Sequence, residues 1–374
     1  MKKKTIGIIG GGLSGLVAAI HLSQKNLPVT LFEKDTYPNH KVCGEYVSQE
    51  IVPYFNQLGI NLSDIHPAYI DELLFSDTSG NIVNTKLPLG GLGISRYALD
   101  EFLYKKAIET GVQFIHDLVI DINYAEDEFE LITNNKGSFQ FEMVLGAYGK
   151  RSLLDKKLDR QFIDKKSGWL AVKGHYKKVD FPDNLVMLHN FEGGYCGLSK
   201  TETGTINVCY LASYNSFKKY KDPTLFKNKV LMQNPHLKNF FQNATPLFEK
   251  DLSIAQISFE KKTSIQDHIL MLGDAAGLIH PLSGNGMAMA IHSAKIASEA
   301  ILNYCSDSEI SREDMEKEYQ KKWKEQFSSR LQMGNILQKI LLNPNLSKFV
   351  QRIISSFPFL LPKIISRTHG KPIL

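Results

Sequence analysis

Short apolar runs separated by glycine-rich or polar breaks dominate the first forty residues. Residues 5–9 form an apolar run that predicts a buried parallel strand, and the sequence GGGLSG follows at once. Residues 14–24 then carry a helical pattern, and residues 29–32 form a second apolar strand that ends at Glu33. The pattern predicts a strand, a tight turn, a helix and a second parallel strand, in that order.

The turn after the first strand has glycine at three spaced positions. Gly10, Gly12 and Gly15 match the G-x-G-x-x-G pattern, with Leu13 and Ser14 inside it. The first glycine permits a tight turn, the second lets the backbone approach a pyrophosphate, and the third lets helix and strand pack closely. The following helix points its N-terminal N–H groups at the phosphates. The turn therefore predicts a dinucleotide site.

An acidic residue at the end of the second strand agrees with such a site. Glu33 lies 18 residues after Gly15 and is followed by Lys34. A carboxylate near this spacing binds the two hydroxyls of a ribose and disfavours a 2′-phosphate there. The motif favours FAD or NAD over NADP, and a purely structural glycine turn is the alternative.

A second glycine-rich stretch follows far downstream, in HILMLGDAAGLIHPLSGNGMAMA. Residues 269–272 predict a buried strand that closes on Gly273 and Asp274. A loop with proline and glycine then opens a helix predicted over residues 286–301, whose small side chains allow another element to approach closely. An aspartate at such a place is also consistent with a simple helix N-cap.

Between these two stretches the pattern is that of antiparallel strands. Three segments predict a meander: residues 119–124, 129–133 and 139–144. Residues 168–214 alternate as four further strands with turns between them. Residues 222–243 predict a helical segment broken at Pro235, and residues 253–259 predict a strand that returns to the first domain.

With these motifs the chain resembles the FAD-dependent enzymes built like aromatic hydroxylases, the group A flavoprotein monooxygenases, and more narrowly the geranylgeranyl reductases. The resemblance implies that Asp274 hydrogen-bonds the ribityl or phosphate part of FAD. It also implies that the P-x-x-G-x-G match at Pro281, Gly284 and Gly286 places a helix N-terminus at the pyrimidine edge of the flavin. A helix N-terminus there stabilises the negative charge of reduced flavin.

Two further segments match this family. Arg96 begins a helix with one apolar face, in a segment similar to the family's R-x-x-L-D-x-x-L, whose arginine contacts FAD. Because an arginine at a helix N-terminus opposes the helix dipole, a role toward a ligand is favoured over a plain surface position. The sequence VLGAYGKRS resembles G-A-D-G-x-x-S, but Tyr148 replaces the aspartate. That departure argues against direct reduction by NADPH, while Gly149 keeps a backbone role in FAD binding.

The stretch HKVCGEYVSQE resembles a C-G-x-x-x-S-like segment of the reductases that passes the flavin ring. The resemblance makes Cys43 a candidate catalytic proton donor, and a thiol that only packs beside the ring is the equal alternative. Gly44 lets the backbone approach the ring. Glu45, Tyr195 and Cys196 are candidate residues of the substrate pocket, with ordinary structural positions as the alternative. The four cysteines show neither a disulfide framework nor zinc spacing, so no metal is expected.

The cofactor expected from these motifs is FAD, with NAD(P)H or another reductant as the electron donor. The residues expected to hold FAD are Gly10, Gly12, Leu13, Ser14, Gly15, Glu33, Lys34, Cys43, Gly44, Arg96, Val119, Gly149, Gly273, Asp274, Pro281, Gly284, Gly286 and Met287.

The expected fold class is α/β, with a Rossmann-like FAD domain of the glutathione-reductase type, an inserted antiparallel-sheet substrate domain and a C-terminal helical segment. Residues 1–70, 96–160 and 266–303 are assigned to the FAD domain. Residues 71–95 and 161–265 are assigned to the substrate domain, and residues 304–374 to the helical region.

Composition and charge change this picture little. Of the 374 residues, 43% are hydrophobic and 22% charged, as in ordinary globular proteins, and the net charge is +5. No long block of lysine and arginine points to nucleic acid, and no apolar stretch reaches the roughly 18 to 20 residues of a membrane span.

Dispersed cysteines fit a reducing compartment, so a cytoplasmic location is expected. Residues 349–365 carry an apolar face opposite basic side chains, which predicts either a docked helix or a peripheral membrane contact.

We therefore expect an FAD-dependent oxidoreductase that acts on a hydrophobic small molecule, as a monomer or a homodimer. A monooxygenase or hydroxylase of an aromatic or lipid-like secondary metabolite ranks first, slightly ahead of an enzyme like the geranylgeranyl reductases that saturates isoprenoid double bonds. A flavin-dependent halogenase ranks lower because the sequence has no W-x-W-x-I-P motif. A lipid-binding flavoprotein without turnover also ranks lower.

Overall fold

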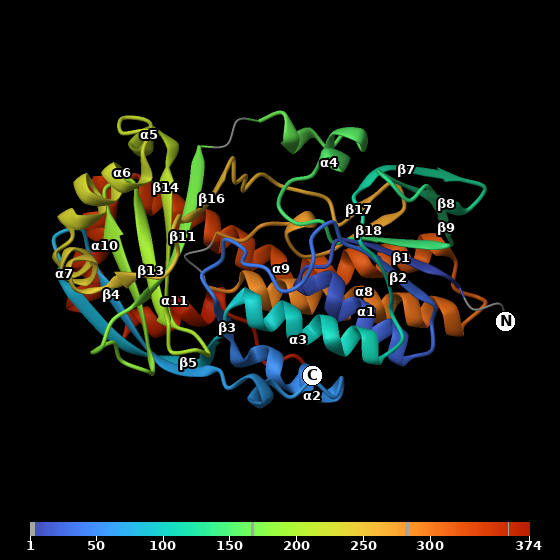
Figure 1. The fold of residues 1–374 in the computed structure, drawn as a ribbon, viewed down its shortest axis with the longest axis horizontal. Helices are drawn as coiled ribbons and strands as arrows, with labels where there is room; N and C mark the ends of the chain where they lie inside the picture. Colours follow the sequence, from blue (N-terminus) through green and yellow to red (C-terminus); the bar gives the residue numbers. More distant parts are fainter. Residues whose placement is uncertain (1–3, 166–167, 281–283, 358) are drawn as a thin grey trace.

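The computed structural model describes residues 4–165, 168–280, 284–357 and 359–374, and it has two main sheets and a long helical layer (Figure 1). The first sheet has the strand order β17–β18–β10–β1–β2–β6. Its strands pair in parallel except for β17, which joins antiparallel. Every residue of β1 is buried, which explains its uninterrupted apolar sequence. The strands are β1 (Ile6–Ile9), β2 (Val29–Phe32), β6 (Gln113–Ile115), β10 (Met143–Gly146), β17 (Ile265–Gln266) and β18 (Ile269–Met271).

Helices cover one face of this sheet and a three-stranded meander covers the other (Figure 1). The helices are α1 (Leu13–Gln24), α3 (Arg96–Glu109) and α8 (Gly286–Ser306), and the meander is β7 (Val119–Ala125), β8 (Glu128–Thr133) and β9 (Ser138–Phe141). The ring of Phe32 packs against those of Phe139 and Phe141, at centroid distances of 5.4 and 5.8 Å. The sheet is therefore sealed on both faces and only its ends remain for a ligand.

The second sheet has the strand order β15–β11–β14–β13–β12–β4–β5–β3, and β16 pairs with β11. All its pairs are antiparallel except β12 with β4. The strands are β3 (Tyr46–Ser48), β4 (Ala68–Ser76), β5 (Ile82–Gly93), β11 (Trp169–Lys177), β12 (Leu185–Phe191), β13 (Gly194–Lys200), β14 (Ile206–Ser213), β15 (Thr245–Pro246) and β16 (Leu252–Ala255).

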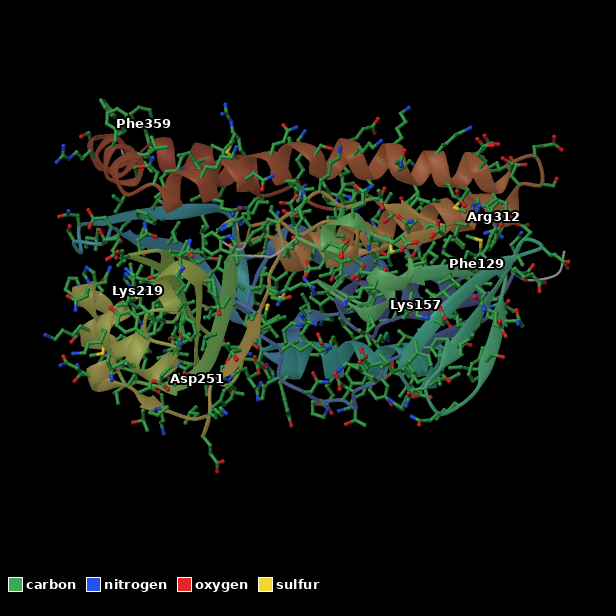
Figure 2. The ribbon with its side chains drawn as sticks, turned by 90° about the horizontal axis from the view of Figure 1, so that it is seen from above. Phe129, Lys157, Lys219, Asp251, Arg312 and Phe359 are labelled. Carbon is green, nitrogen blue, oxygen red and sulfur yellow. The ribbon has the colours of Figure 1, made fainter. Side chains whose placement is uncertain are left out.

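Helices pack on the second sheet in two groups. One group packs against an apolar cluster that includes Val172 and Phe226: α5 (Tyr214–Phe217), α6 (Pro223–Lys229) and α7 (Pro235–Asn243). The other group packs Ile354, Leu361 and Ile365 against β4 and β5: α10 (Pro344–Ser356) and α11 (Leu360–Thr368). The long helix α9 (Arg312–Leu342) runs along one side of the molecule, past both sheets, and Arg312 and Phe359 mark opposite ends of the helical layer (Figure 2). The remaining short elements are η1 (Gln49–Ile51), α2 (Val52–Gln57), η2 (Leu62–Ile65), α4 (Leu153–Lys157), η3 (Gln161–Ile163), η4 (Leu231–Gln233) and η5 (Gly273–Ala275).

The fold class expected from the sequence is confirmed, and two local predictions are corrected. Pro235 does not break a helix but begins α7, with the Asn234 side chain capping its first turn. The strand predicted over residues 253–259 does not return to the first sheet. It is β16, which ends at Ala255 and extends the second sheet through its pairing with β11.

The C-terminal apolar face packs on the body of the protein, which agrees with the prediction of a docked helix. Within the described ranges, no helix combines the length and the apolar composition that crossing a bilayer requires.

Candidate functional site

The turn between β1 and α1 needs glycine where the sequence places it. Gly10 has a φ of +104°, and a Cβ on it would lie 2.5 Å from the Ala147 carbonyl oxygen. A Cβ on Gly15 would lie 1.9 Å from the carbonyl oxygen of Gly10, so α1 packs directly on the turn. Gly12 precedes α1 without a side-chain cap, so the N–H groups of the first turn, at Leu13 and Ser14, are available to a phosphate.

Glu33 lies beside this turn and bonds its backbone. One carboxylate oxygen accepts from Gly11 N–H at 2.8 Å, and the other accepts from Asp35 N–H at 3.0 Å. The Tyr37 hydroxyl donates to the Gly11 carbonyl oxygen at 2.6 Å. Lys34 is exposed at the surface, where it pairs with Asp35 at 3.2 Å. The structure therefore brings Glu33 to the glycine turn and leaves Lys34 in solvent.

Arg96 stands at the start of α3 with its guanidinium beside the same turn. Nη2 lies 3.9 Å from the position of a Cβ on Gly12. The guanidinium donates two bonds of 2.7 Å to Asp100, one turn along the helix, and Lys41 adds a third contact to that carboxylate at 3.0 Å. Burial alone would raise the pKa of Asp100, but Arg96 and Lys41 hold it below its usual range. Asp100 is thus an anion that fixes the orientation of Arg96.

Asp274 lies at the end of β18, close enough to Arg96 to favour its charged form. Its carboxylate has no hydrogen-bond partner among the described residues, while its carbonyl oxygen accepts from Lys262 at 2.7 Å. Gly273 has a φ of +52°, and its N–H donates to Ser293 in α8 at 2.8 Å. A Cβ on Gly273 would lie 3.0 Å from Ser14 Oγ, so Asp274 follows a residue that packs against the first turn of α1.

Tyr148, the residue that departs from the family pattern, is held inside the protein. Its hydroxyl lies 3.4 Å from both Met271 Sδ and Arg160 Nη1, and burial raises its pKa above the usual range. Arg160 in turn forms a buried ion pair of 3.0 Å with Asp155. Tyr148 therefore supplies a neutral hydroxyl where the family has a carboxylate. Beside it, Gly149 has a φ of +85° and open space where a Cβ would stand.

The loop of Cys43 and Gly44 passes the same region. Cys43 is half-buried and close enough to favour the charged form of Arg96, and its sulfur accepts from Glu45 N–H at 3.4 Å. Asn207 holds the loop by donating to the Cys43 carbonyl oxygen at 3.2 Å. Gly44 is exposed, and a Cβ on it would meet no atom of the described residues within 4 Å. The backbone at Gly44 is therefore open to a flat ligand.

Glu45 does not line an open pocket as expected, because its carboxylate is fully buried and engaged. It accepts from Arg96 N–H and from His175 Nε2, each at 2.7 Å, and it pairs with the buried ammonium of Lys173. Its φ of +53° is a left-handed conformation that this set of contacts maintains. Burial would raise the pKa of Glu45, but His175 and Lys173 lower it overall. Glu45 therefore anchors the loop from behind.

One group among the described residues has ligand atoms close enough to hold a metal ion. These are His40, Glu45 and His175, whose candidate atoms lie within 4.8 Å of one another. The Lys173 ammonium contacts the same carboxylate and would repel a divalent cation. The arrangement therefore fits an internal ion pair better than a metal centre.

Tyr195 and Cys196 point to opposite faces of the second sheet, so they cannot both line one pocket. Cys196 is fully buried under α6 and α7, which corrects its expected place. Tyr195 faces the other side, in an apolar cluster with Trp169 and Leu278. There the His280 ring lies 5.7 Å from Trp169 and 6.1 Å from Tyr195. Burial lowers the pKa of His280 to about 3, so this surface is neutral and apolar.

The remaining expected residues fall in three places. Gly284, with a φ of +62°, and Gly286 lead into α8, and Met287 is buried in its first turn. Val119 is the first residue of β7 in the meander, and its side chain is buried in the core. Pro281 lies outside the described residues.

Together these features fit FAD. An uncapped helix start, the Arg96 cation, the Asp274 carboxylate and two open glycine backbones, Gly44 and Gly149, meet at one end of the first sheet. Such a set offers N–H groups to phosphates, a carboxylate to hydroxyls and flat backbone to a ring.

Several residues of this region were not predicted from the sequence. Asp100 was detectable, because it follows Arg96 at the i, i+4 spacing of a helical ion pair. Lys173 and His175 interrupt an otherwise apolar strand, which signals buried partners but does not identify them. Lys262 gave no sequence signal, since its contacts to Lys150 and Asp274 arise only from the fold.

Comparisons with known proteins agree with this geometry. A family model described as an NAD(P)-binding Rossmann-like domain matches residues 8–40, and one described as squalene epoxidase matches residues 199–343. The chain is 26% identical to a digeranylgeranylglycerophospholipid reductase of Methanococcus aeolicus, over 89% of this chain and 86% of that protein. It is 23% identical to a chloroplastic geranylgeranyl diphosphate reductase of Arabidopsis thaliana, over 94% and 77%.

Solved structures share the fold. A flavin-dependent brominase superposes with a TM-score of 0.79 at 18% identity, covering 98% of this chain and 93% of the other. A geranylgeranyl bacteriochlorophyll reductase-like protein of Thermoplasma acidophilum gives 0.76 at 18% identity, covering 98% and 92%. The chain is thus similar in sequence to proteins named as geranylgeranyl reductases, and it shares its fold with flavin-dependent enzymes.

Proposed function

We propose that this enzyme saturates carbon–carbon double bonds of an isoprenoid chain. The observation that carries the proposal is the loop of Cys43 and Gly44, placed near Arg96 and Asp274 in a chain similar along 89% of its length to a digeranylgeranylglycerophospholipid reductase. The sequence alone ranked oxygen insertion slightly ahead of this reaction. The relatives' names now favour reduction.

The reaction adds two electrons and two protons across one double bond. Reduced FAD, when bound, supplies a hydride. The second proton must come from a protein group beside the substrate, and the Cys43 thiol is the group we assign to it. The loop that carries this thiol is fixed by the Asn207 contact and, through Glu45, by two strand residues, Lys173 and His175.

We assign the hydrocarbon chain of the substrate to the side of the second sheet where Trp169, Tyr195, Phe259 and His280 form an apolar surface. Its rings pack edge to face or tilted, with His280 4.8 Å from Phe259. Since burial keeps His280 uncharged, this surface has no ionised group to hold water next to the reacting carbon atoms.

A monooxygenase that acts on a hydrophobic substrate is the second candidate. The match of residues 199–343 to a family described as squalene epoxidase favours it, because squalene is also an isoprenoid chain. The same apolar surface would serve either reaction. The brominase shares the fold alone, and at 18% identity it carries no argument for halogenation.

The electron donor and the membrane contact are also proposals. Because a neutral Tyr148 replaces the aspartate of the motif, we infer that NADPH does not bind at this residue and that another reductant reduces the flavin.

Phe349 and Phe359 expose 61% and 60% of their surfaces on the C-terminal helices, and Arg352 is exposed nearby in sequence. Figure 2 shows Phe359 directed away from the body at one end of the molecule. We propose that these residues touch a membrane surface from which a lipid substrate is taken, in an otherwise cytoplasmic monomer or homodimer.

The test compares products with and without oxygen. The FAD-loaded protein is reduced chemically and incubated with geranylgeranyl diphosphate under argon and in air, and the products are identified by mass spectrometry. We expect a gain of two hydrogens per reduced bond under argon. A product that gains one oxygen, and only in air, would move the assignment to the monooxygenase. Protein without FAD serves as the control.

A further inference from the structure

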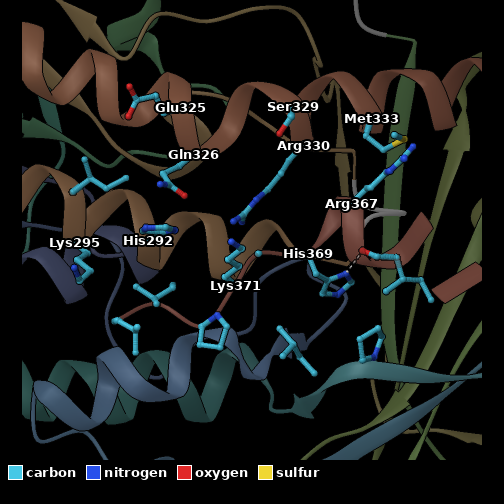
Figure 3. Close-up of a pocket in the computed structure, with 18 of the residues that line it drawn as sticks. His292, Lys295, Glu325, Gln326, Ser329, Arg330, Met333, Arg367, His369 and Lys371 are labelled. Carbon is cyan, nitrogen blue, oxygen red and sulfur yellow. Dashed lines mark hydrogen bonds between the residues drawn. The ribbon is translucent and has the colours of Figure 1, made fainter. Parts of the chain in front are cut away.

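A large cleft lies outside the flavin region, between α8, α9, β5 and the C-terminal segment 369–374. Its volume is about 1200 Å³ (Figure 3). Nothing in the flavin chemistry described above uses this cleft. Its size is sufficient for a drug-sized or larger ligand.

The cleft is lined by both apolar and charged side chains. Leu87, Pro88 and Leu89 of β5 form an apolar wall, and Ile296 of α8 and Met333 of α9 add apolar side chains elsewhere in the lining. The charged side chains that line it are the cations Lys295, Lys322, Arg330, Arg367 and Lys371 and the carboxylates Glu299 and Glu325. Three of the cations already have partners: Lys295 pairs with Glu299, Lys322 with Glu318, and Arg330 with Glu50.

The other two cations are available to a ligand. Arg367 and Lys371 are exposed, and among the described residues neither forms an ion pair. His292 also faces the cleft, and its Nδ1 is buried without a hydrogen-bond partner in the described parts of the chain (Figure 3). Burial, with Arg330 and Lys295 nearby, lowers the pKa of His292 to about 4, as expected where positive charge is already in excess.

The segment that carries Lys371 is fixed on both sides of this residue. The Gly370 N–H donates to the Glu50 carboxylate, which also binds Arg330 at 3.2 Å. The Ile373 N–H donates to the Glu50 carbonyl oxygen at 2.8 Å, and the Ile373 side chain is buried in the core. Lys371 is therefore held at the cleft by an anchored backbone.

The cleft also approaches the flavin region. Tyr46, which lines it, lies on β3, one residue after Glu45. Its ring would lie 3.6 Å from a Cβ on Gly284, in the turn that leads into α8. One side chain thus borders both the cleft and the start of the helix expected at the flavin.

We propose that this cleft binds the phosphate or diphosphate head of the isoprenoid substrate, with Arg367 and Lys371 contacting the head and the β5 wall contacting the adjoining chain. The inference rests on the proposed function, which supplies the isoprenoid chain. Charge complementarity argues for an anionic head, because two lining cations, Arg367 and Lys371, form no ion pair within the described ranges, against one such lining carboxylate, Glu325. The apolar wall argues for a head that continues into a hydrocarbon chain.

Binding measurements on the oxidised FAD-loaded enzyme test this site without turnover. Isothermal titration with geranylgeranyl diphosphate, inorganic pyrophosphate, geranylgeraniol and NADPH separates the head, the chain and a nucleotide as sources of affinity. We expect geranylgeranyl diphosphate to bind the wild type at least about tenfold more tightly than geranylgeraniol, and added salt to reduce this advantage.

The double variant R367A/K371A tests the two residues. We expect it to bind geranylgeranyl diphosphate about tenfold more weakly, the sum of two partly exposed charge contacts, with geranylgeraniol unchanged. K317A is the matched control, because Lys317 is an exposed lysine on α9 outside the cleft. Equal thermal unfolding of the variants shows that the fold is retained.

Two outcomes overturn the proposal. One is a double variant that binds geranylgeranyl diphosphate within twofold of the wild type. The other is a loss of affinity confined to NADPH, which would make the cleft a nucleotide site. If the double variant reduces geranylgeranyl diphosphate and binds it with unchanged affinity, the cleft is not the head-group site and the proposed function stands. If affinity depends on Arg367 and Lys371 but no reduction occurs, the head-group site stands and the proposed function is wrong.

Discussion

The buried carboxylate behind the cysteine loop allows a quantitative prediction. Replacing Lys173 with methionine removes an ammonium that is fully buried against the fully buried Glu45 carboxylate. Methionine fills similar volume, so the main loss is the charge partner. Glu45 keeps its bonds to His175 and to the Arg96 N–H. The substitution therefore removes the ion pair with Glu45, together with one hydrogen bond of 3.1 Å from Lys173 to the Lys41 carbonyl oxygen.

The expected loss follows from the burial of both groups. Removing one partner of a buried ion pair typically costs about 3–5 kcal/mol, because the other charge remains buried. At an unfolding entropy of about 2.1 cal/mol/K per residue, a chain of 374 residues has about 0.8 kcal/mol/K. A loss of about 4 kcal/mol therefore lowers Tm by about 5 °C.

The loss must depend on pH in a defined direction. In the wild type the pKa of Glu45 is lowered, so its pairing stabilises the fold above the unfolded value of 4.5 and this stabilisation disappears as pH falls through the folded value. Without Lys173, the effect of burial is opposed by His175 and no longer by an ammonium, so the pKa of Glu45 rises relative to the wild type. The variant's deficit is then full at pH 7.5 and shrinks toward pH 4.5, where protonation removes the unpaired charge.

Differential scanning calorimetry of K173M at these two pH values measures both effects. K165M is the control, because Lys165 forms an exposed pair with Glu260 and should change Tm by less than about 1 °C. A K173M deficit below about 1 °C at pH 7.5, or one that is equal at both pH values, would refute the reasoning about Glu45.

The remaining predictions concern the cofactor, the thiol and the membrane. G12V places side-chain atoms toward Arg96 in the phosphate turn and should lower FAD affinity at least about tenfold, measured by flavin fluorescence, with an unchanged circular dichroism spectrum. D274N removes a carboxylate that has no partner among the described residues, so apo-protein Tm should stay within about 2 °C while FAD affinity falls about tenfold. C43S should keep its FAD content and lose at least about tenfold in product formation if the thiol donates the proton; unchanged turnover would exclude that role. F349S/F359S should weaken sedimentation with anionic liposomes at least about threefold and leave reduction of a soluble short-chain substrate unchanged, whereas equal sedimentation would exclude this contact surface.

The parts of the fold that the sequence predicted are those with local signals. The apolar runs of β1 and β2 and the glycine turn between them depend on backbone geometry within a few residues, so their pattern is visible in the sequence. The antiparallel strands from Trp169 to Ser213 are buried along most of their length, and the turns that separate them are visible in the sequence. Strand pairing is not local, and this explains why β16 was assigned to the wrong sheet.

The site was predictable only where a residue belongs to a short sequence motif. Arg96 and Asp274 stand in such motifs, and the structure brings them near each other. Glu45 was expected in an open pocket because its partners, Lys173 and His175, lie about 130 residues away on β11. Tyr195 and Cys196 were grouped because they are neighbours in sequence, although strand geometry separates their side chains. The positions that the sequence did not predict are therefore mostly those that depend on contacts between residues far apart in the chain.

The central claim is that this protein transfers electrons from reduced FAD to an isoprenoid double bond. A single-turnover experiment under argon tests it most directly: the chemically reduced, FAD-loaded enzyme is mixed with geranylgeranyl diphosphate, flavin absorbance is followed, and the product is quantified. We predict reoxidation of the flavin with one double bond reduced per FAD. A flavin that stays reduced under argon and reoxidises only when oxygen is admitted, with no reduced product, would contradict the claim.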